Sequence, residues 1–533
     1  ACWVTSAPAL ADRTQLHELF DAEWERGLRE EPAGATFLGD TRYNDRWADR
    51  SPAAIDASHA ADRAAFARLA TIDPAQLSAE DRLNQDLFRR QLQGSLDSYA
   101  YGEQFTPLSQ QSGLTSLHQL AELVVFRSAR DYEQWLARLD TIDRLVDQNI
   151  ALLRAGVRRG LVPPKILVQR LPKQIEQQLV SEPTHSPFYG PFQHVPNSIP
   201  AAERERLQAA ARQAISTKVV PAYTRLKQYV EREYLPQCRD TVGIWDTPNG
   251  AKRYAELVRW YTTTDLTPDQ VHELGLAEVA RIRAEMQHVI ERTGFQGSFE
   301  EFLDFLRTDP RFRYTDSKEL FAAYAAMAKR IDPLLPQYFG KLPRMPYGVR
   351  AIDEQTAPDT TTAYYQPPAM DGTRAGYYYV NLYKPEERPK YEIPVLTIHE
   401  AVPGHHLQIA LAQELGDLPK FRRFFEATAY VEGWGLYSES LGQEMGLYDD
   451  PYDKFGQLTY EMWRAVRLVV DTGLHNKRWT RQQAIDYFKA NAAKTELDIV
   501  NEVDRYIGWP GQALAYKIGE LRIKQLRREA TAE

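Results

Sequence analysis

The feature that most constrains the fold is a helical repeat of apolar residues, spaced three and four apart, that runs through most of the chain. Two capping boxes mark helix starts, Thr267 with Gln270 and Thr480 with Gln483. The sequence therefore predicts a mainly α protein. We expect helices over residues 11–30, 52–72, 78–100, 130–160, 200–236, 267–294 and 316–340.

The repeat is interrupted between Arg350 and Tyr383. Within this stretch, residues 373–383 (TRAGYYYVNLY) are rich in aromatic and β-branched side chains, which are typical of a strand. We therefore expect a small β-sheet next to the histidine-rich motif at residues 398–408, which follows it.

A loop rich in Pro, Ser and His at residues 183–200 divides the chain. The sequence predicts three parts of one continuous unit: a tail or tether over 1–10, an N-terminal helical lobe over 11–195 and a second lobe over 196–533.

Charge and cysteine content narrow the class of protein. The net charge of -8 and the pI near 5.9 leave no basic surface for phosphates, so we expect no nucleic-acid partner. Only Cys2 and Cys238 are present, which excludes a disulfide-rich scaffold and a four-thiolate zinc module. No window approaches the roughly 18 consecutive apolar residues of a transmembrane helix.

The first residues allow two interpretations. Ala1-Cys2 has the form of a bacterial lipoprotein cleavage site, and it also fits an ordinary cloning boundary. The first interpretation predicts a lipid tether at Cys2 and a location in the bacterial cell envelope or periplasm, whereas the second leaves a cytoplasmic location open. The sequence does not indicate an oligomeric state.

Residues 398–408 (IHEAVPGHHLQ) hold three of the chain's eleven histidines. In an H-E-x-x-H zinc helix, the second histidine comes four positions after the first, but here that position is Pro403. On a continuous helix neither His405 nor His406 would share a metal with His399. Pro403 and Gly404 make such a helix improbable, and a bulge or short loop would bring one of the later histidines back to the metal.

A third ligand is offered by residues 428–444 (TAYVEGWGLYSESLGQE), where Glu432 and Glu439 share a helix face. Here the sequence resembles the gluzincin peptidases of the thimet oligopeptidase and neurolysin group. In those enzymes an H-E-x-G-H helix precedes a helix whose first glutamate binds zinc. The chain departs from that pattern by two inserted residues, Val402-Pro403 or their neighbours.

A closer resemblance rests on three motifs in order: HEAVPGHHLQ, VEGWGLY and the C-terminal PGQALAYKIG. Together they resemble a bacterial family of large α-helical proteins defined by an unknown-function domain, often expected to be lipoproteins and grouped with gluzincin zinc peptidases. The resemblance implies a zincin-like helical fold with a deep cleft. It implies zinc ligands His399, His405 (with His406 as the alternative) and Glu432, a general base, Glu400, and a residue that orients a ligand histidine, Glu439.

A zinc hydrolase also needs a donor to the oxyanion of the transition state. Residues 504–519 (DRYIGWPGQALAYKIG) offer Tyr506 and Tyr516. Arg505-Tyr506 resembles the R-Y pair of angiotensin-converting enzyme, whereas Tyr516 stands in the family's own motif. Arg505 is a candidate to meet a substrate carboxylate, with an internal ion pair as the alternative.

The strand before the motif is a candidate for substrate binding. In zincins an edge strand near the metal binds extended substrate by β-addition, and residues 376–381, with Gly376 and Tyr378, would supply it; a plain core strand is the alternative. His475 is a further candidate for the cleft wall.

These expectations favour a zinc-dependent metallopeptidase that hydrolyses amide bonds of short peptides with zinc-activated water and a glutamate base. The alternative is a zincin-like protein that binds peptides and has lost turnover. The chain has no G-x-S-x-G elbow, Walker loop or G-x-G-x-x-G, and a single E-x-x-H within an expected helix, Glu285 to His288, whereas a di-iron bundle needs two.

Overall fold

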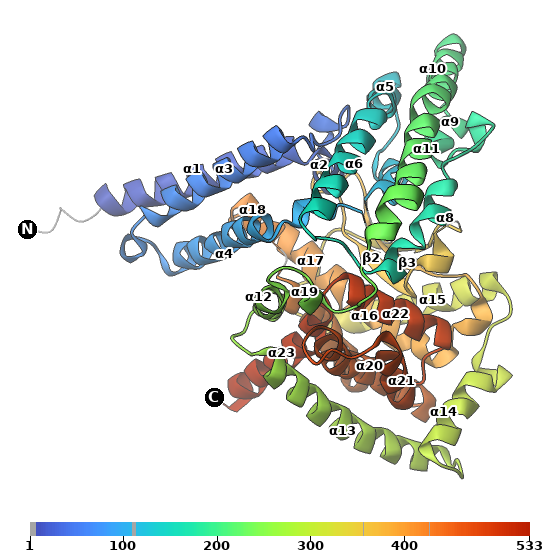
Figure 1. The fold of residues 1–533 in the computed structure, drawn as a ribbon. Helices are drawn as coiled ribbons and strands as arrows, with labels where there is room; N and C mark the ends of the chain where they lie inside the picture. The colour runs from blue at the N-terminus through green and yellow to red at the C-terminus, as the bar shows by residue number, and fades with distance from the viewer. Residues whose placement is uncertain (1–6, 109–112, 355, 426, 533) are drawn as a thin grey trace, which may run out of the picture. The chain divides into compact units, whose positions relative to one another are not determined.

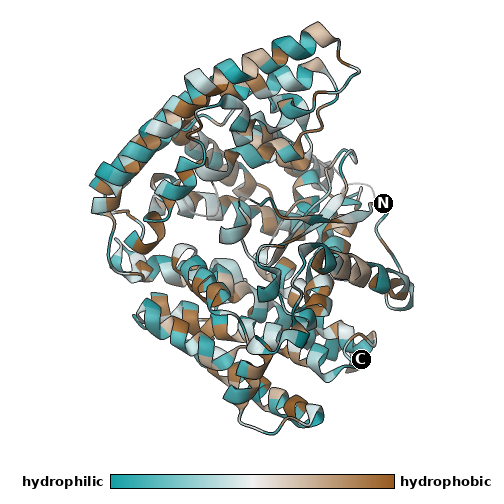
Figure 2. Cartoon of the chain, turned by 90° about the vertical axis from the view of Figure 1, so that its right-hand side faces the viewer, coloured by the Kyte–Doolittle hydropathy of each residue, from teal (hydrophilic) through white to brown (hydrophobic). Residues whose placement is uncertain are grey.

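The computed structural model describes residues 7–108, 113–354, 356–425 and 427–532. They form two compact units. Unit 1 holds the described residues up to Asp240 together with Ala369–Thr373 and Leu415–Phe425; unit 2 holds Thr241–Pro368, Arg374–Glu414 and the described residues from 427 on. Both are built mainly of amphipathic helices, whose ribbons carry hydrophilic and hydrophobic residues side by side (Figure 2).

Unit 1 contains only helices and loops among its described residues. Its longest helical stretch runs without a break from Ala201 to Tyr234, because π-helical turns at Ile215–Val219 and Val230–Tyr234 continue α10 and α11. The α-helices are α1 (Ala7–Glu30), α2 (Pro32–Leu38), α3 (Pro52–Ala70), α4 (Ala79–Tyr101), α5 (Ala129–Asp140), α6 (Ile142–Arg158), α7 (Lys165–Val168), α8 (Leu171–Glu176), α9 (Gly190–Gln193), α10 (Ala201–Ala214), α11 (Val220–Tyr229) and α18 (Lys420–Arg423).

The expected helices of this unit are present, with one division: the helix predicted over 130–160 is two helices, α5 and α6, separated at Thr141. The loop of residues 183–200 lies inside unit 1, because α10, which follows it, packs on α5, and α11 packs on α6. The boundary between the units falls after Asp240, not within that loop.

Unit 2 is organised around α20 (Pro451–His475), whose residues from Phe455 to His475 are all buried. It packs against α13, α16, α21, α22 and α23 (Figure 1). The helices of unit 2 are α12 (Gly250–Thr262), α13 (Pro268–Thr293), α14 (Phe299–Thr308), α15 (Ser317–Ile331), α16 (Ile393–Glu400), α17 (His405–Gln413), α19 (Thr428–Glu444), α20, α21 (Arg481–Asn491), α22 (Glu496–Gly508) and α23 (Ala515–Ala532). Both predicted capping boxes are confirmed, Thr267 on α13 and Thr480 on α21.

The predicted strand is confirmed as β3 (Gly376–Val380). It lies in the centre of a three-stranded sheet, parallel to β1 (Tyr347–Ala351) and antiparallel to β2 (Ala363–Gln366). The fold is thus mainly α-helical with one small sheet, and β2 packs against α16, which carries the H-E pair.

None of the described helices is both long and apolar enough to cross a membrane. Cys2, the expected tether, lies outside the described residues.

Candidate metal centre

The H-E motif ends one helix and the later histidines begin another. All eight residues of α16 are buried, and the helix stops at Glu400, where Ala401 takes φ -97° and ψ -106°. The Gly404 N–H donates to the Ile398 carbonyl at 3.0 Å and the His406 N–H donates to that of Ala401 at 3.0 Å. A Cβ on Gly404 would lie 2.0 Å from the His399 carbonyl oxygen, so only glycine fits this turn.

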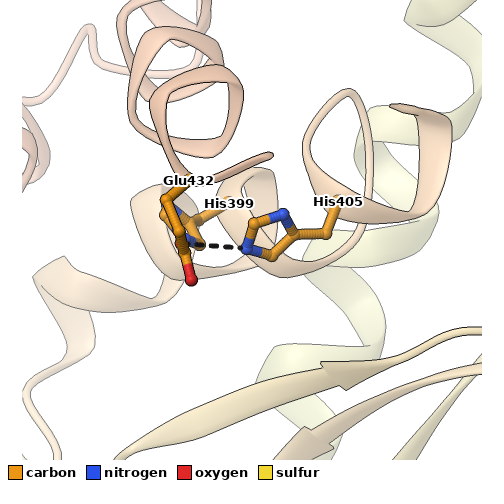
Figure 3. Close-up of side chains that lie close together, drawn as sticks. All are labelled: His399, His405 and Glu432. Carbon is orange, nitrogen blue, oxygen red and sulfur yellow. Dashed lines mark ion pairs between the residues drawn. The ribbon is translucent and has the colours of Figure 1, made fainter. Parts of the chain in front are cut away.

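This break brings His405 next to His399. Their ring centroids are 4.7 Å apart and the ring planes nearly perpendicular, at 84°. The Oε2 atom of Glu432, from α19, lies 3.6 Å from Nε2 of His399 and 3.4 Å from Nε2 of His405. The three side chains come from three helices and point toward one another (Figure 3). Among the described residues they form a group of potential ligand atoms that lie within 4.8 Å of one another.

The geometry and chemistry of this set fit a zinc ion. Bonds of about 2.05 Å in a tetrahedron place ligand atoms about 3.4 Å apart, close to the two measured separations. Two histidines and a glutamate are one of the ligand sets of catalytic zinc, with a fourth position left for water or substrate. Oε2 of Glu432 is buried and faces only the two imidazoles, at 3.6 and 3.4 Å, with no other partner among the described residues, which is costly for a carboxylate that binds no ion.

Electrostatics also favours a cation here. Burial alone would lower the pKa of His399, but hydrogen bonds to Glu432 and Glu439 outweigh burial and raise it to about 9. Burial would raise the pKa of Glu432, and the hydrogen bonds to the two histidines instead hold it well below its ordinary value. A pocket that stabilises positive charge on imidazole also stabilises a bound divalent ion.

Glu439 contacts the nitrogen of His399 that does not face Glu432, in agreement with the orienting role that the resemblance implies. Its Oε1 lies 2.8 Å from Nδ1 of His399, which leaves Nε2 facing Glu432. Glu439 is fully buried and also lies 3.4 Å from Nη2 of Arg464. Such a carboxylate fixes the tautomer and orientation of a ligand histidine.

Three residues that support the cluster were not anticipated. Gly435 lets α19 approach α16, since a Cβ there would lie 2.7 Å from Cε1 of His399. Trp434 donates from Nε1 to the Pro403 carbonyl at 2.8 Å and so fastens the break to α19. Arg464, a buried arginine of α20, lies 3.4 Å from Oε1 of Glu439. The available signals were a glycine inside a helical pattern and an arginine within a helical pattern, and neither identifies a partner.

His406, the alternative ligand, points away from the cluster. Its Nε2 lies 3.0 Å from the Met345 carbonyl oxygen and its Nδ1 lies 2.8 Å from the Tyr365 hydroxyl. Burial lowers its pKa to about 4. Both nitrogens are therefore engaged, and the structure places His405 alone of the pair in the group with His399 and Glu432.

Glu400 follows His399 at the end of α16 and is 8% exposed. Its carboxylate makes no hydrogen bond or ion pair within the described parts of the chain, and its charge contributes to the raised pKa of His399, after burial and the bonds to Glu432 and Glu439. The carboxylate is therefore near the cluster and uncommitted.

The two candidate tyrosines differ sharply. The Tyr516 ring stacks over His399 with centroids 6.4 Å apart, and its hydroxyl accepts a hydrogen bond from Nη2 of Arg505 at 3.2 Å. The Tyr506 hydroxyl accepts from Trp463 at 2.8 Å and Arg467 at 2.9 Å and also bonds Glu502. Because Tyr506 is buried and saturated with partners, the expectation that it serves as an oxyanion donor is corrected.

Two further expectations are corrected. β3 is paired on both sides, so it cannot accept a substrate strand at Gly376, and Tyr378 is a fully buried core residue packed edge-on against Tyr324. His475 is not a cleft residue: it is buried, accepts the Ile244 N–H at 3.1 Å and donates to the Tyr506 carbonyl at 2.9 Å.

Arg505 has the internal partners that were the alternative to substrate binding. It contacts Gln512 at 2.9 Å and Glu502 at 3.5 Å, besides Tyr516, yet its side chain remains 15% exposed. It therefore lies at the border between the buried network and solvent.

Comparisons with known proteins agree with this architecture. The structure resembles that of the "putative lipoprotein" from Colwellia psychrerythraea, with 29% sequence identity, a TM-score of 0.89 and coverage of 99% of this chain and 94% of the other. It shares its fold with a lipoprotein of the same description and unknown function from Shewanella oneidensis, at 16% identity, a TM-score of 0.70 and coverage of 97% and 94%. No curated protein matches the sequence. A family model described as bacterial protein of unknown function (DUF885) matches residues 32–533, and the chain belongs to that family.

Proposed function

We propose that the protein is a zinc-dependent metallopeptidase acting on short peptides. The observation that carries the proposal is the convergence of His399, His405 and Glu432 at separations that suit one zinc ion, beside an uncommitted Glu400. When bound, zinc would polarise the scissile carbonyl and make water a stronger nucleophile at neutral pH.

Glu400 is the general base in this proposal. Its carboxylate takes the proton of the attacking water and passes it to the leaving amine. A base must lie close to the water it activates and must not be tied up in an ion pair; Glu400 meets both conditions, since it adjoins His399 and has no partner among the described side chains.

Tyr516 is the donor to the oxyanion. Its oxygen accepts from Arg505, so its own hydroxyl hydrogen stays available to donate to the developing charge. Stacking over His399 keeps the phenol beside the metal ligands.

Two features would bind the peptide. β2 is an edge strand, so its backbone can add a substrate strand on the side away from β3, and its Tyr365 ring lies 6.4 Å from that of His405. Arg505, whose side chain is partly exposed, would meet a substrate carboxylate. The restriction to short peptides rests on the resemblance to gluzincins, which hold the metal in a deep cleft.

The decisive experiment replaces the base. Glu400→Gln should abolish peptide hydrolysis and leave the zinc content unchanged. Glu273→Gln is the matched control, because Glu273 also follows a histidine but is exposed on α13 and far from the group of three in sequence. Hydrolysis that persists in Glu400→Gln excludes this mechanism, and zinc and peptide binding without cleavage by the wild type would indicate a peptide-binding protein.

We further propose a cell-envelope location with a lipid on Cys2, supported by the likeness to the Colwellia protein. Fatty-acid labelling of the full-length precursor in bacteria, compared with a Cys2→Ala variant, tests this.

A further inference from the structure

His406 lies in α17 and contacts residues of the sheet and next to it. A carbonyl oxygen only accepts, so the 3.0 Å contact with Met345 requires the imidazole proton on Nε2. Nδ1 is then an acceptor, and the Tyr365 hydroxyl donates to it at 2.8 Å. One imidazole therefore makes two directional hydrogen bonds.

These bonds reach the two outer strands of the sheet. Tyr365 is part of β2, and Met345 stands two residues before β1, whose first residue, Tyr347, packs its ring 4.8 Å from that of His406. The central strand makes room for this junction, because a Cβ on Gly376 would lie 2.5 Å from the Tyr365 hydroxyl and 3.0 Å from Nδ1 of His406.

The junction lies one residue from the metal cluster. His405 and His406 are consecutive in the first turn of α17, so His405 faces Glu432 while His406 faces the sheet. Any shift of β2 relative to α17 would have to break the Tyr365–His406 bond.

We propose that His406 is a positioning residue that fixes the outer edge of β2 relative to His405, so that a peptide backbone paired with that edge is aligned with the metal centre. The inference deepens the proposed function and rests on its metal site. It assigns the two adjacent histidines different tasks: His405 binds the ion, and His406 sets the substrate strand.

The test separates alignment from metal binding. Two probes are a dipeptide hydroxamate, which is too short to pair along β2, and a hexapeptide hydroxamate, which can. Their affinities for the zinc-loaded protein are measured by calorimetry for wild type, Tyr365→Phe, His406→Gln and the double variant. Gln can keep a donor near Met345, but it removes the acceptor for Tyr365.

We expect each single substitution to weaken hexapeptide binding about fivefold, as for one lost hydrogen bond, and the double variant to bind like either single one. Dipeptide affinity and zinc affinity should not change. Equal affinity of the wild type for both probes, equal losses for both probes, or weaker zinc binding in His406→Gln overturns the proposal. If the wild type prefers the hexapeptide but cleaves no peptide, the proposed catalysis fails and the positioning role stands.

Discussion

Nδ1 of His399 lies 2.8 Å from Oε1 of Glu439, a carboxylate with no exposure to solvent. The proposed zinc ligand His399 is thus itself held by a buried carboxylate. Carboxylates in this position raise the basicity of the ligand and fix its orientation.

Glu439→Gln should therefore weaken zinc binding by about 10- to 100-fold, because the amide keeps the shape but loses the charge. Competition with a chromophoric chelator measures the dissociation constant. Glu444→Gln, an exposed position on the same helix, is the control and should bind zinc as the wild type does. Equal affinities of the two variants would contradict a role for Glu439 in holding His399.

Gly435→Ala tests the close approach of α19 to His399. Alanine favours a helix over glycine by about 1 kcal/mol, so an unconstrained site would be stabilised. Here the new Cβ would lie 2.7 Å from Cε1 of His399, so the ring must shift from its present position. We expect zinc affinity to fall at least tenfold, as for disturbed orientation of a ligand. Gly340→Ala, where nothing lies within 4 Å, should leave zinc affinity unchanged.

Local sequence signals predicted local structure well. Capping boxes placed the starts of α13 and α21, and apolar spacing placed the helix that continues from Ala201 to Tyr234. The resemblance to the gluzincins also pointed to the three residues that the structure brings together, whereas the break at Pro403 and Gly404 by itself left the choice between His405 and His406 open.

Long-range relationships could not be predicted in the same way. Aromatic and β-branched residues identify β3 as a strand, but its two neighbours depend on pairing with segments elsewhere in the chain, so its central position was missed. Tyr506 and Tyr516 lie on consecutive helices, α22 and α23, and the chain turns between them at Gly511, with φ +84°. That turn determines which of the two tyrosines contacts His399, and the spacing of residues along the sequence does not predict it.

Tyr516→Phe should lower the rate of catalysis, whereas Tyr506→Phe should lower the stability of the fold. Loss of the Tyr516 hydroxyl removes a donor to the oxyanion, and we expect kcat to fall about 10²- to 10³-fold with zinc content and stability retained. Tyr506→Phe leaves the buried donors of Trp463 and Arg467 without an acceptor and should lower the thermal stability. Steady-state kinetics and thermal unfolding separate the two, and a larger kcat loss in Tyr506→Phe would reverse the assignment.

Asp471, fully buried in α20, should make stability depend on pH. Burial raises its pKa to about 7, although bonds from Tyr254 and the Gly511 N–H act in the opposite direction. In the unfolded chain the pKa of an aspartate is about 3.9, so between about pH 4 and 7 the folded state holds a proton that the unfolded state has lost. The free energy of unfolding therefore falls as pH rises through this window, by up to about 4 kcal/mol, and above about pH 7 this contribution no longer changes. Thermal unfolding of the wild type and of Asp471→Asn, both in the presence of a chelator, measures this dependence. The contributions of the other carboxyl groups cancel in the difference between the two proteins. The melting temperature of the variant minus that of the wild type should increase from about pH 4 to 7. A difference that stays constant over this range would show that Asp471 does not titrate there.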